Sequence, residues 1–259
     1  MDTWRFIDTG VNTGEANMHF DEMLAQRVVE GIGGPVVRVF RWKPWAVSLG
    51  YNQNAGDLDI ARCRRDGIDV VRRPTGGRAI LHAEELTYSV VMYAERRSVL
   101  QVYNEISRAL VRGLGLFGVN VTLQKSQPDL RHRYRQASSI PCFTSSARYE
   151  VEQDGRKLIG SAQRRYSDGA RDVVLQHGSI LCGSAHRRLV DYLSGDDGAV
   201  RDQIRNELAE KTVDLSHLIG RPVKYDELAA ALRKGFELEW GVTFGAAPSE
   251  VRSEAMLPV

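Results

Sequence analysis

Cys142 is the cysteine whose surroundings best suit a chemical role. It follows Pro141 and precedes Phe143, in a stretch rich in serine rather than in apolar residues. A lone cysteine is more often a small buried side chain than a nucleophile, so both interpretations stay open for Cys142. Cys63, in a charged helical segment, and Cys182, at the end of a β-rich run, fit the buried alternative.

A glycine pair with basic neighbours forms a second candidate. The segment 72–82 reads RRPTGGRAILH. Adjacent arginines on a strand face opposite sides, so only one of Arg72 and Arg73 can enter a pocket. Gly76 and Gly77 let backbone N–H groups approach a ligand that a Cβ would exclude. A β-hairpin turn with a basic flank explains the same composition.

The third candidate is the segment 154–163, which reads DGRKLIGSAQ. It combines a tight turn, a basic strand that carries Lys157, and then the small residues Gly160, Ser161 and Ala162. Small side chains on a strand leave room for an apolar chain beside it. The alternative is a hairpin whose Lys157 is simply solvated.

Composition excludes several classes of protein. The 259 residues include 35 Lys and Arg against 33 Asp and Glu, a net charge of +2, which argues against a protein that wraps nucleic acid. No apolar run approaches the roughly 20 residues that span a bilayer, and the first residues lack a secretory signal. Three cysteines without a Cys-x-x-Cys pair indicate neither a disulfide framework nor a zinc site. We therefore expect a cytoplasmic protein without nucleic-acid or membrane partners.

The elements that position these segments mix strands and helices. Helices are expected to begin at Asn12, through a capping box with Glu15, and at Ser98. Further helices are expected at 57–67, 186–194, 200–212 and 225–239, and strands at 4–8, 36–42, 46–50, 68–72, 78–81, 86–93, 119–123, 147–152, 156–163 and 173–181. The alternation is not strictly βαβ, so the fold class is α/β (mixed α+β), with mixed sheets flanked by helices.

Four further segments add to the sequence motifs described above. They are NMHFDE at 17–22, SLGYNQ at 48–53, ELTYS at 85–89 and QHGSIL at 176–181. Together with 72–82 and 155–163, in this order and spacing, the chain resembles the lipoate-protein ligase A / biotin ligase catalytic-domain family. The resemblance implies one catalytic domain over 1–220, with its core at about 32–218, and a short helical C-terminal extension of that domain over 221–259.

Within that family, the chain most resembles the cysteine-dependent octanoyltransferase branch. Cys142-Phe143 followed by Tyr149-Glu150 matches that branch, and Arg78 follows the glycine pair where ligases usually carry a third glycine. Only 39 residues (259 − 220) follow Gly220, which is short for the accessory domain of many ligases. The resemblance implies octanoyl transfer from octanoyl-acyl carrier protein, through a cysteine thioester, to a lysine of a lipoyl domain such as glycine cleavage H protein, without a cofactor or metal.

The resemblance also implies roles for single residues. Cys142 is expected to be the acyl-thioester nucleophile, with its pKa lowered by Lys157. The residues expected to wall the acyl pocket are Arg73, Gly76, Gly77, His82, Gly160, Ser161 and Ala162. His82 is either a proton shuttle or a structural hydrogen-bonding group, and His177 is expected to satisfy buried backbone groups rather than to act in catalysis.

Other functions stay open. An ATP-dependent lipoate–protein ligase, an octanoyl amidotransferase between lipoyl domains, and a non-catalytic acyl-binding module are compatible with the same scaffold. The basic segment 131–135 either steers an acidic carrier protein or is a solvated loop. We expect a monomer.

Overall fold

The computed structural model describes residues 3–123, 150–195 and 197–245. Cys142 and the basic segment 131–135 lie outside these ranges. Within them, a seven-stranded sheet has the order β1-β2-β6-β10-β9-β8-β7, and a three-stranded sheet has the order β4-β3-β5. The strands are β1 (Arg5–Asn12), β2 (Val36–Trp42), β3 (Ala46–Leu49), β4 (Asp69–Arg72), β5 (Ile80–His82), β6 (Glu85–Tyr93), β7 (Thr122–Leu123), β8 (Val151–Gln153), β9 (Arg156–Ser167) and β10 (Asp172–Leu181).

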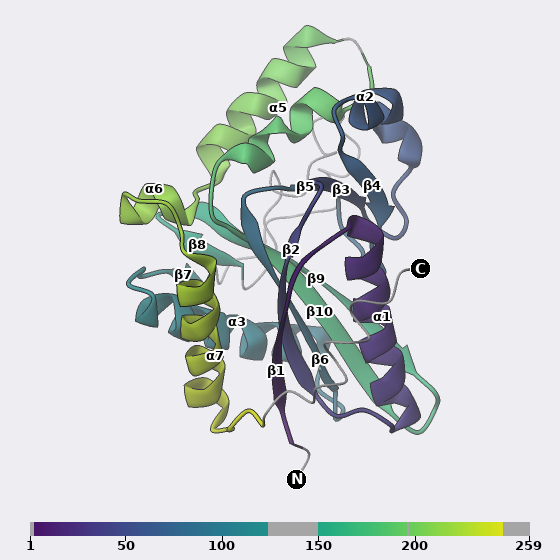
Figure 1. Ribbon diagram of the computed structural model, residues 1–259, viewed down its shortest axis with the longest axis vertical. Helices are drawn as coiled ribbons and strands as arrows, with labels where there is room; N and C mark the ends of the chain where they lie inside the picture. The colour runs from purple at the N-terminus through teal and green to yellow at the C-terminus, as the bar shows by residue number, and fades with distance from the viewer. Residues whose placement is uncertain (1–2, 124–149, 196, 246–259) are drawn as a thin grey trace.

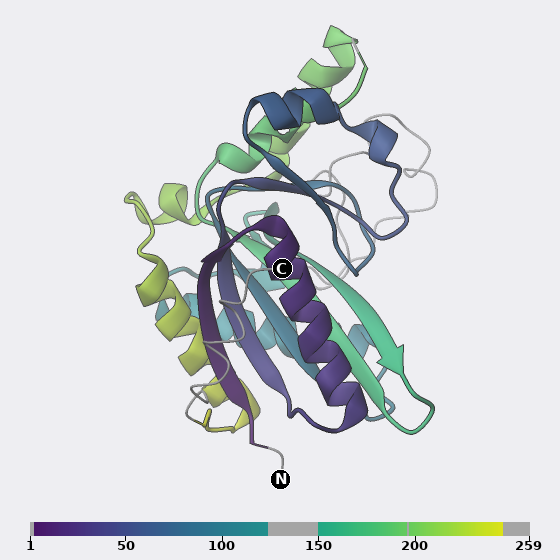
Figure 2. The same cartoon turned by 45° about the vertical axis from the view of Figure 1, so that its right-hand side comes forward.

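Helices cover both faces of the large sheet. Helix α1 (Gly14–Glu30) lies along one face, while α3 (Val99–Leu116) and α7 (Tyr225–Trp240) pack on the other (Figure 1). The small sheet lies at one end of the large sheet, close to α2 (Ile60–Arg65) and α5 (Gly198–Lys211) (Figure 2). The remaining described helices are α6 (Leu215–Ile219) and the 3-10 helices η1 (Ala55–Asp57) and η4 (Ala185–Tyr192).

Both sheets are mixed, as the sequence predicts. In the large sheet, β1 runs parallel to β2, whereas the other neighbouring strands are antiparallel. In the small sheet, β3 is parallel to β4 and antiparallel to β5. The predicted mixed α/β fold is therefore confirmed.

Alternation along β2 separates the two faces of the large sheet. Val37 and Val39 belong to the main core, which also contains buried residues of α3 and α7. Val36 packs in the second core cluster, with Leu24 of α1. Because side chains alternate along a strand, Arg38 points to the α1 side as well. This places a buried guanidinium beneath α1.

Helix boundaries follow local capping, with one correction. The capping residue of α1 is Thr13 and not Asn12, because the Thr13 hydroxyl accepts a hydrogen bond from the Ala16 N–H at 3.3 Å. Gly31 ends α1 in the left-handed conformation, with φ of 77°. Ser98 begins α3 as predicted, and Gln101 completes a capping box there.

Other boundaries differ modestly. The predicted turn at Asp154-Gly155 is confirmed, since both residues have positive φ. Strand β9 runs on to Ser167, beyond the predicted end at residue 163. Helix α6, which is only five residues long, is not in the sequence prediction because so short a segment carries little periodicity. None of the described helices combines the length and the apolar character needed to cross a membrane.

His186 ties η4 to the segment after α5 and makes the fold sensitive to acid. Its Nε2 lies 2.9 Å from the Thr212 hydroxyl and its Nδ1 lies 3.1 Å from the Gly183 carbonyl. Burial lowers the pKa of His186 to about 4. Below pH of about 6.5 the unfolded chain binds a proton that the folded chain does not, so stability falls as the pH drops towards 4.

We expect this histidine to contribute a loss of about 2–3 kcal/mol in the free energy of unfolding between pH 6.5 and 4. Urea unfolding measured across this range should show a shallower pH dependence for His186→Gln than for the unmodified protein. Parallel curves for the two proteins would contradict the assignment. The comparison concerns slopes, so the lower absolute stability expected for the variant does not affect it.

Candidate active site

A pocket opens where the small sheet meets the α1 side of the large sheet. It contains all the predicted substrate-binding residues except Gly76. The residues that line it are Met18, Trp42, Arg73, Gly77, Ile80, His82, Thr87, Gly160, Ser161, Ala162, His177, Gly178 and Ser179. The predicted groups therefore come together from the loop after β4, from β5 and from β9, although their role in binding stays a prediction.

Arg73 holds the glycine loop in shape. Its side chain is 3% exposed. One Nη donates to the carbonyl and the hydroxyl of Ser48, at 3.0 Å each, and the other donates to the carbonyls of Gly76 and Arg78, at 2.9 and 2.7 Å. Arg72, on the opposite side of the strand, donates to the carbonyls of the loop that follows β3. Only one of the two adjacent arginines enters the pocket, as their alternation requires.

His82 is fixed at both ring nitrogens. Its Nε2 lies 2.7 Å from the Ser48 hydroxyl and its Nδ1 lies 2.7 Å from Oε1 of Glu85. A carboxylate only accepts, so Nδ1 carries the proton and Nε2 accepts from Ser48. The ring also stacks on Trp42 with the centroids 4.0 Å apart. With both nitrogens engaged, the geometry favours the structural alternative for His82 over a proton shuttle.

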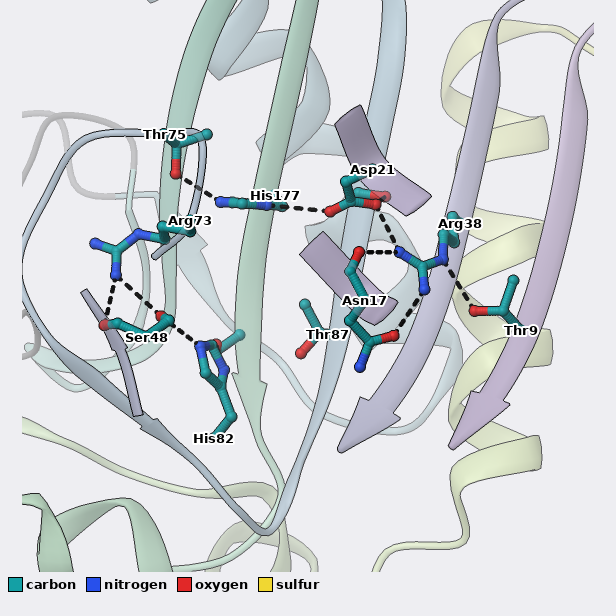
Figure 3. A network of polar contacts seen from close by, with 12 residues as sticks. Thr9, Asn17, Asp21, Arg38, Ser48, Arg73, Thr75, His82, Thr87 and His177 are labelled. Atoms are coloured by element: carbon teal, nitrogen blue, oxygen red, sulfur yellow. Dashed lines mark hydrogen bonds and ion pairs between the residues drawn. The ribbon is translucent and has the colours of Figure 1, made fainter. Parts of the chain in front are cut away.

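His177 has the same arrangement on the neighbouring wall. Its Nε2 lies 2.6 Å from the Thr75 hydroxyl and its Nδ1 lies 3.2 Å from Oδ2 of Asp21 (Figure 3). The prediction that His177 satisfies backbone groups is therefore wrong. The reason is that β10 is paired on both sides, by β6 and β9, so the sheet already satisfies the backbone around this residue. His177 instead links α1 to the glycine loop.

Asp21 connects this link to the guanidinium beneath α1. Its Oδ1 accepts from Arg38 and from the Ser89 hydroxyl, both at 2.7 Å. Arg38 also donates to the side chain of Asn17 at 2.7 Å and to the Thr9 hydroxyl at 2.9 Å (Figure 3). The network is almost fully buried, and it joins α1, β1, β2, β6, β10 and the glycine loop.

The charges in this network are balanced. Burial by itself would raise the pKa of Asp21, but the Arg38 guanidinium and the hydrogen bonds from His177 and Ser89 hold that pKa below its usual value. Burial lowers the pKa of His177, although Asp21 opposes the shift. The pair Asp21 and Arg38 is therefore ionised while the His177 imidazole is neutral at neutral pH. A neutral imidazole can accept a hydrogen bond from the Thr75 hydroxyl at Nε2.

Lys157 is buried rather than solvated. Its ammonium lies 2.6 Å from Oε1 of Glu150, and both side chains are 3% exposed. The solvated-hairpin alternative for the segment 154–163 is therefore wrong. Lys157 lies on β9, three residues before the pocket residue Gly160. Because Cys142 is outside the described residues, its contact with Lys157 stays a prediction.

The two described cysteines fit structural roles. Cys63 and Cys182 are buried, and neither forms a disulfide bond. Burial raises the pKa of both thiols, and more strongly for Cys182, so neither favours the thiolate that a nucleophile needs. Within the described ranges, no three His, Cys, Asp or Glu side chains gather as metal ligands.

Several pocket and network residues were absent from the predicted site. Met18 and Trp42 line the pocket, while Asp21 and Arg38 support one of its walls. The signal for Met18 and Asp21 was available in the segment NMHFDE at 17–22, whose polar residues interrupt an otherwise amphipathic helix. Trp42 carried no comparable signal, because an aromatic residue at the end of a strand is also typical of a core.

Comparison with known proteins decides the family. The model of the lipoyl protein ligase A/B catalytic domain matches residues 13–237, which is most of the chain. The protein belongs to this family. The resemblance expected from the sequence is thereby confirmed. The described pocket lies within the matched residues, as do His82, His177 and the partners that contact their ring nitrogens.

Relatives of high similarity are octanoyltransferases. Octanoyltransferase LipM of Kyrpidia tusciae is 38% identical over 259 residues, which cover 98% of this chain and 92% of that protein. Octanoyltransferase LipM of Symbiobacterium thermophilum is 37% identical over 243 residues, with 93% and 87% covered. Within the family, the chain is therefore similar over almost its full length to proteins of the LipM type.

Solved structures agree in fold. A bipartite lipoate protein ligase from Thermoplasma acidophilum superimposes with a TM-score of 0.75 at 20% identity, covering 98% of this chain and 91% of that one. Lipoate-protein ligase A bound with ATP gives a TM-score of 0.72 at 19% identity, covering 98% and 92%. At such identities the likeness concerns the fold alone.

Proposed function

We propose that the protein transfers an octanoyl group from octanoyl-acyl carrier protein to a lysine of a lipoyl domain, such as glycine cleavage H protein. The acyl group passes through a thioester on Cys142. The observation that carries this proposal is the similarity, over nearly the whole chain, to proteins named octanoyltransferase LipM. Protein lipoylation is then the process that the enzyme serves.

The lining of the pocket supports the proposal of an acyl substrate. Gly160 lines it without a side chain, the backbone of Gly178 lines it from the neighbouring strand, and Trp42, Met18 and Ile80 supply apolar surface. Small-molecule sites typically combine such apolar walls with a few fixed polar groups. The hydrogen-bonded histidines and Arg73 give the walls a defined shape, which reduces the entropy lost when a chain binds.

The first step acylates the cysteine. The Cys142 thiolate attacks the carbonyl carbon of the donor thioester, and backbone donors hold the oxyanion of the tetrahedral intermediate. The bond to the carrier's sulfur then breaks, and the carrier leaves as a thiolate that takes up a proton. A free thiol is only a few per cent ionised at neutral pH, so the positive charge of Lys157 assists by stabilising the thiolate.

The second step forms the amide. The neutral ε-amine of the acceptor lysine attacks the acyl-enzyme, a carbon–nitrogen bond forms, and the Cys142 thiolate leaves. The amine's proton passes to the leaving thiolate or to solvent. A thioester is converted to an amide, which is downhill, so the reaction needs neither ATP nor a metal.

Intact-protein mass spectrometry tests the proposal directly. When the pure protein is mixed with octanoyl-acyl carrier protein without ATP, we expect an octanoyl adduct that hydroxylamine removes and that is absent in Cys142→Ala. Adding a lipoyl domain should move the adduct to the acceptor. The matched control is Cys63→Ala, which removes a buried thiol and should retain the adduct.

Other outcomes identify the alternative functions. Modification of the lipoyl domain that requires ATP and free octanoate, with Cys142 dispensable, would replace the proposal by a lipoate–protein ligase. An adduct formed only from an octanoylated lipoyl domain would indicate an amidotransferase. Tight acyl binding without any transfer would indicate a binding module.

A further inference from the structure

We propose that Glu150 is a positioning residue for acyl transfer, because its carboxylate keeps the Lys157 ammonium charged and fixed on the strand that lines the pocket. The inference rests on the role proposed above for Lys157. It assigns no covalent step to Glu150, which acts through its partner alone. The argument depends on the geometry at the start of β9.

The first observation is the buried ion pair. The Lys157 Nζ lies 2.6 Å from Glu150 Oε1, and each side chain is 3% exposed. Removing a lysine from water favours its neutral form, and the shift in pKa can reach several units. A carboxylate at hydrogen-bonding distance opposes that shift. The contact with Glu150 therefore favours the charged form of Lys157.

The second observation is that the backbone of Lys157 is also held. Its carbonyl accepts a hydrogen bond from the Val213 N–H at 3.1 Å, and the residue forms a parallel bridge with Thr212. The segment after α5 thus fixes the main chain, while Glu150 fixes the end of the side chain. A lysine held at both ends presents its charge at one place, as an electrostatic catalyst requires.

Among the described residues, the titratable groups on or beside the elements next to Lys157 include Glu152, Cys182 and Asp214. Glu152 on β8 pairs in register with Lys157, and burial followed by repulsion from Glu150 raises the pKa of Glu152. Burial also raises the pKa of Cys182, just after β10, so that thiol stays neutral. The carboxylate of Asp214 accepts a hydrogen bond from a backbone N–H at 2.9 Å. Within the part of the chain that the structure describes, the carboxylate in direct contact with the Lys157 ammonium is that of Glu150, at 2.6 Å.

Glu152 provides the matched control. It lies two residues from Glu150, is 7% exposed and carries the same carboxylate. Glu152→Gln changes the local charge by the same amount without removing the 2.6 Å contact. If net charge alone matters, both substitutions act alike, whereas the ion pair predicts an effect that is specific to Glu150→Gln.

The experiment measures octanoyl transfer to a lipoyl domain as a function of pH. In Glu150→Gln we expect kcat to fall at least about tenfold while KM changes less than about twofold, because charge at the reacting atoms is affected and substrate binding is not. The alkaline limb of the kcat profile should move to lower pH, since Lys157 then loses its proton more easily. Glu150→Asp should recover most of the activity, and Glu152→Gln should retain it.

A double-mutant cycle separates this role from general damage. In a Lys157→Ala background, Glu150→Gln should cause no further loss of kcat, because its effect passes through Lys157. Equal losses in the two backgrounds, or an unchanged kcat and pH profile in Glu150→Gln, would overturn the inference.

Urea unfolding distinguishes failure of the inference from failure of the proposed function. The midpoints of Glu150→Gln and Lys157→Met should each fall more than that of a Glu150→Met/Lys157→Met variant, since a single substitution leaves one buried charge. If Lys157→Ala retains full transfer, the proposed role of Lys157 fails and the positioning role of Glu150 falls with it. If Lys157→Ala loses transfer while midpoints and kcat show no coupling, only the inference about Glu150 fails.

Discussion

Arg38→Met is expected to lower the free energy of unfolding by about 3–5 kcal/mol, because it leaves the Asp21 carboxylate buried without its counterion. The two groups are 2.7 Å apart, and their side chains are 1% and 0% exposed. Methionine fills part of the space between Phe20 and Phe40, whose rings lie 4.6 and 3.8 Å from the guanidinium carbon. The loss therefore reports the unpaired charge more than a cavity.

Urea unfolding at pH 7 measures the effect. A variant that changes both partners, Arg38→Met with Asp21→Leu, should be more stable than Arg38→Met alone, since no charge stays buried. Surface ion pairs offer the control: Arg205→Met breaks the pairs of Arg205 with Asp202 and Asp191 at the protein surface and should cost less than about 1 kcal/mol. Similar losses for Arg38→Met and Arg205→Met would contradict the buried-charge argument.

The Asp21–Arg38 pair also bears on acid stability. The pKa of Asp21 is lower in the folded protein than in the unfolded chain. Its contribution is therefore present above the unfolded pKa of about 4 and is lost as the pH falls below that value. His186 acts in the range above, between about 6.5 and 4. The two groups therefore contribute to the acid sensitivity of the fold over separate intervals of pH.

Local sequence predicts most of the fold. A run of β-rich residues predicts the strand Val36–Trp42, glycine predicts the end of α1 at Gly31, and Ser98 predicts the start of α3. Each of these features depends on residues within a short stretch of the chain. The register of β9 against β10, which places Ser161 opposite Gly178, depends on contacts between distant segments and is not encoded in either strand alone.

The sequence indicates the separate segments of the candidate site, but it does not indicate the hydrogen bonds that connect them. Residue type and spacing indicate the small residues at 160–162 and the glycine pair as candidates, because few side chains allow such close approach. The partners of His177, by contrast, come from positions 21 and 75, so that no local pattern joins them. Likewise, Lys157 and Glu150 flank a turn, but whether a basic strand residue is solvated or paired depends on what packs over it.

The two histidine networks together make the pocket a rigid structure. Each imidazole is fixed by a hydroxyl on one nitrogen and a carboxylate on the other, so neither ring can rotate without breaking two hydrogen bonds. Ser48 and Thr75, which supply those hydroxyls, are fully buried and are not among the residues that line the pocket. The glycine loop is thereby held against the sheet, which makes its contact with β3 critical.

The end of β3 leaves no room for a side chain at Gly50. A Cβ at this position would lie 2.0 Å from the Gly77 carbonyl oxygen and 2.8 Å from its carbonyl carbon. Both are backbone atoms that cannot rotate away, and the Tyr51 N–H holds the same loop through the Thr75 carbonyl at 2.9 Å. Gly50→Ala must therefore displace the glycine loop as a unit.

We expect Gly50→Ala to lower kcat/KM for octanoyl transfer by about 100-fold, since a shift of about 1 Å in a positioning element can cost that much. The free energy of unfolding should fall by about 1–3 kcal/mol through overpacking. Gly115→Ala is the control, because a Cβ there meets nothing within 4 Å, and in helix α3 it should raise stability by about 0.5–1 kcal/mol without changing transfer. Assays are run well below the unfolding temperature of each variant, so that lost activity reflects the loop. Transfer by Gly50→Ala within about threefold of the unmodified protein would mean that the loop adapts, and that its position against β3 does not control the reaction.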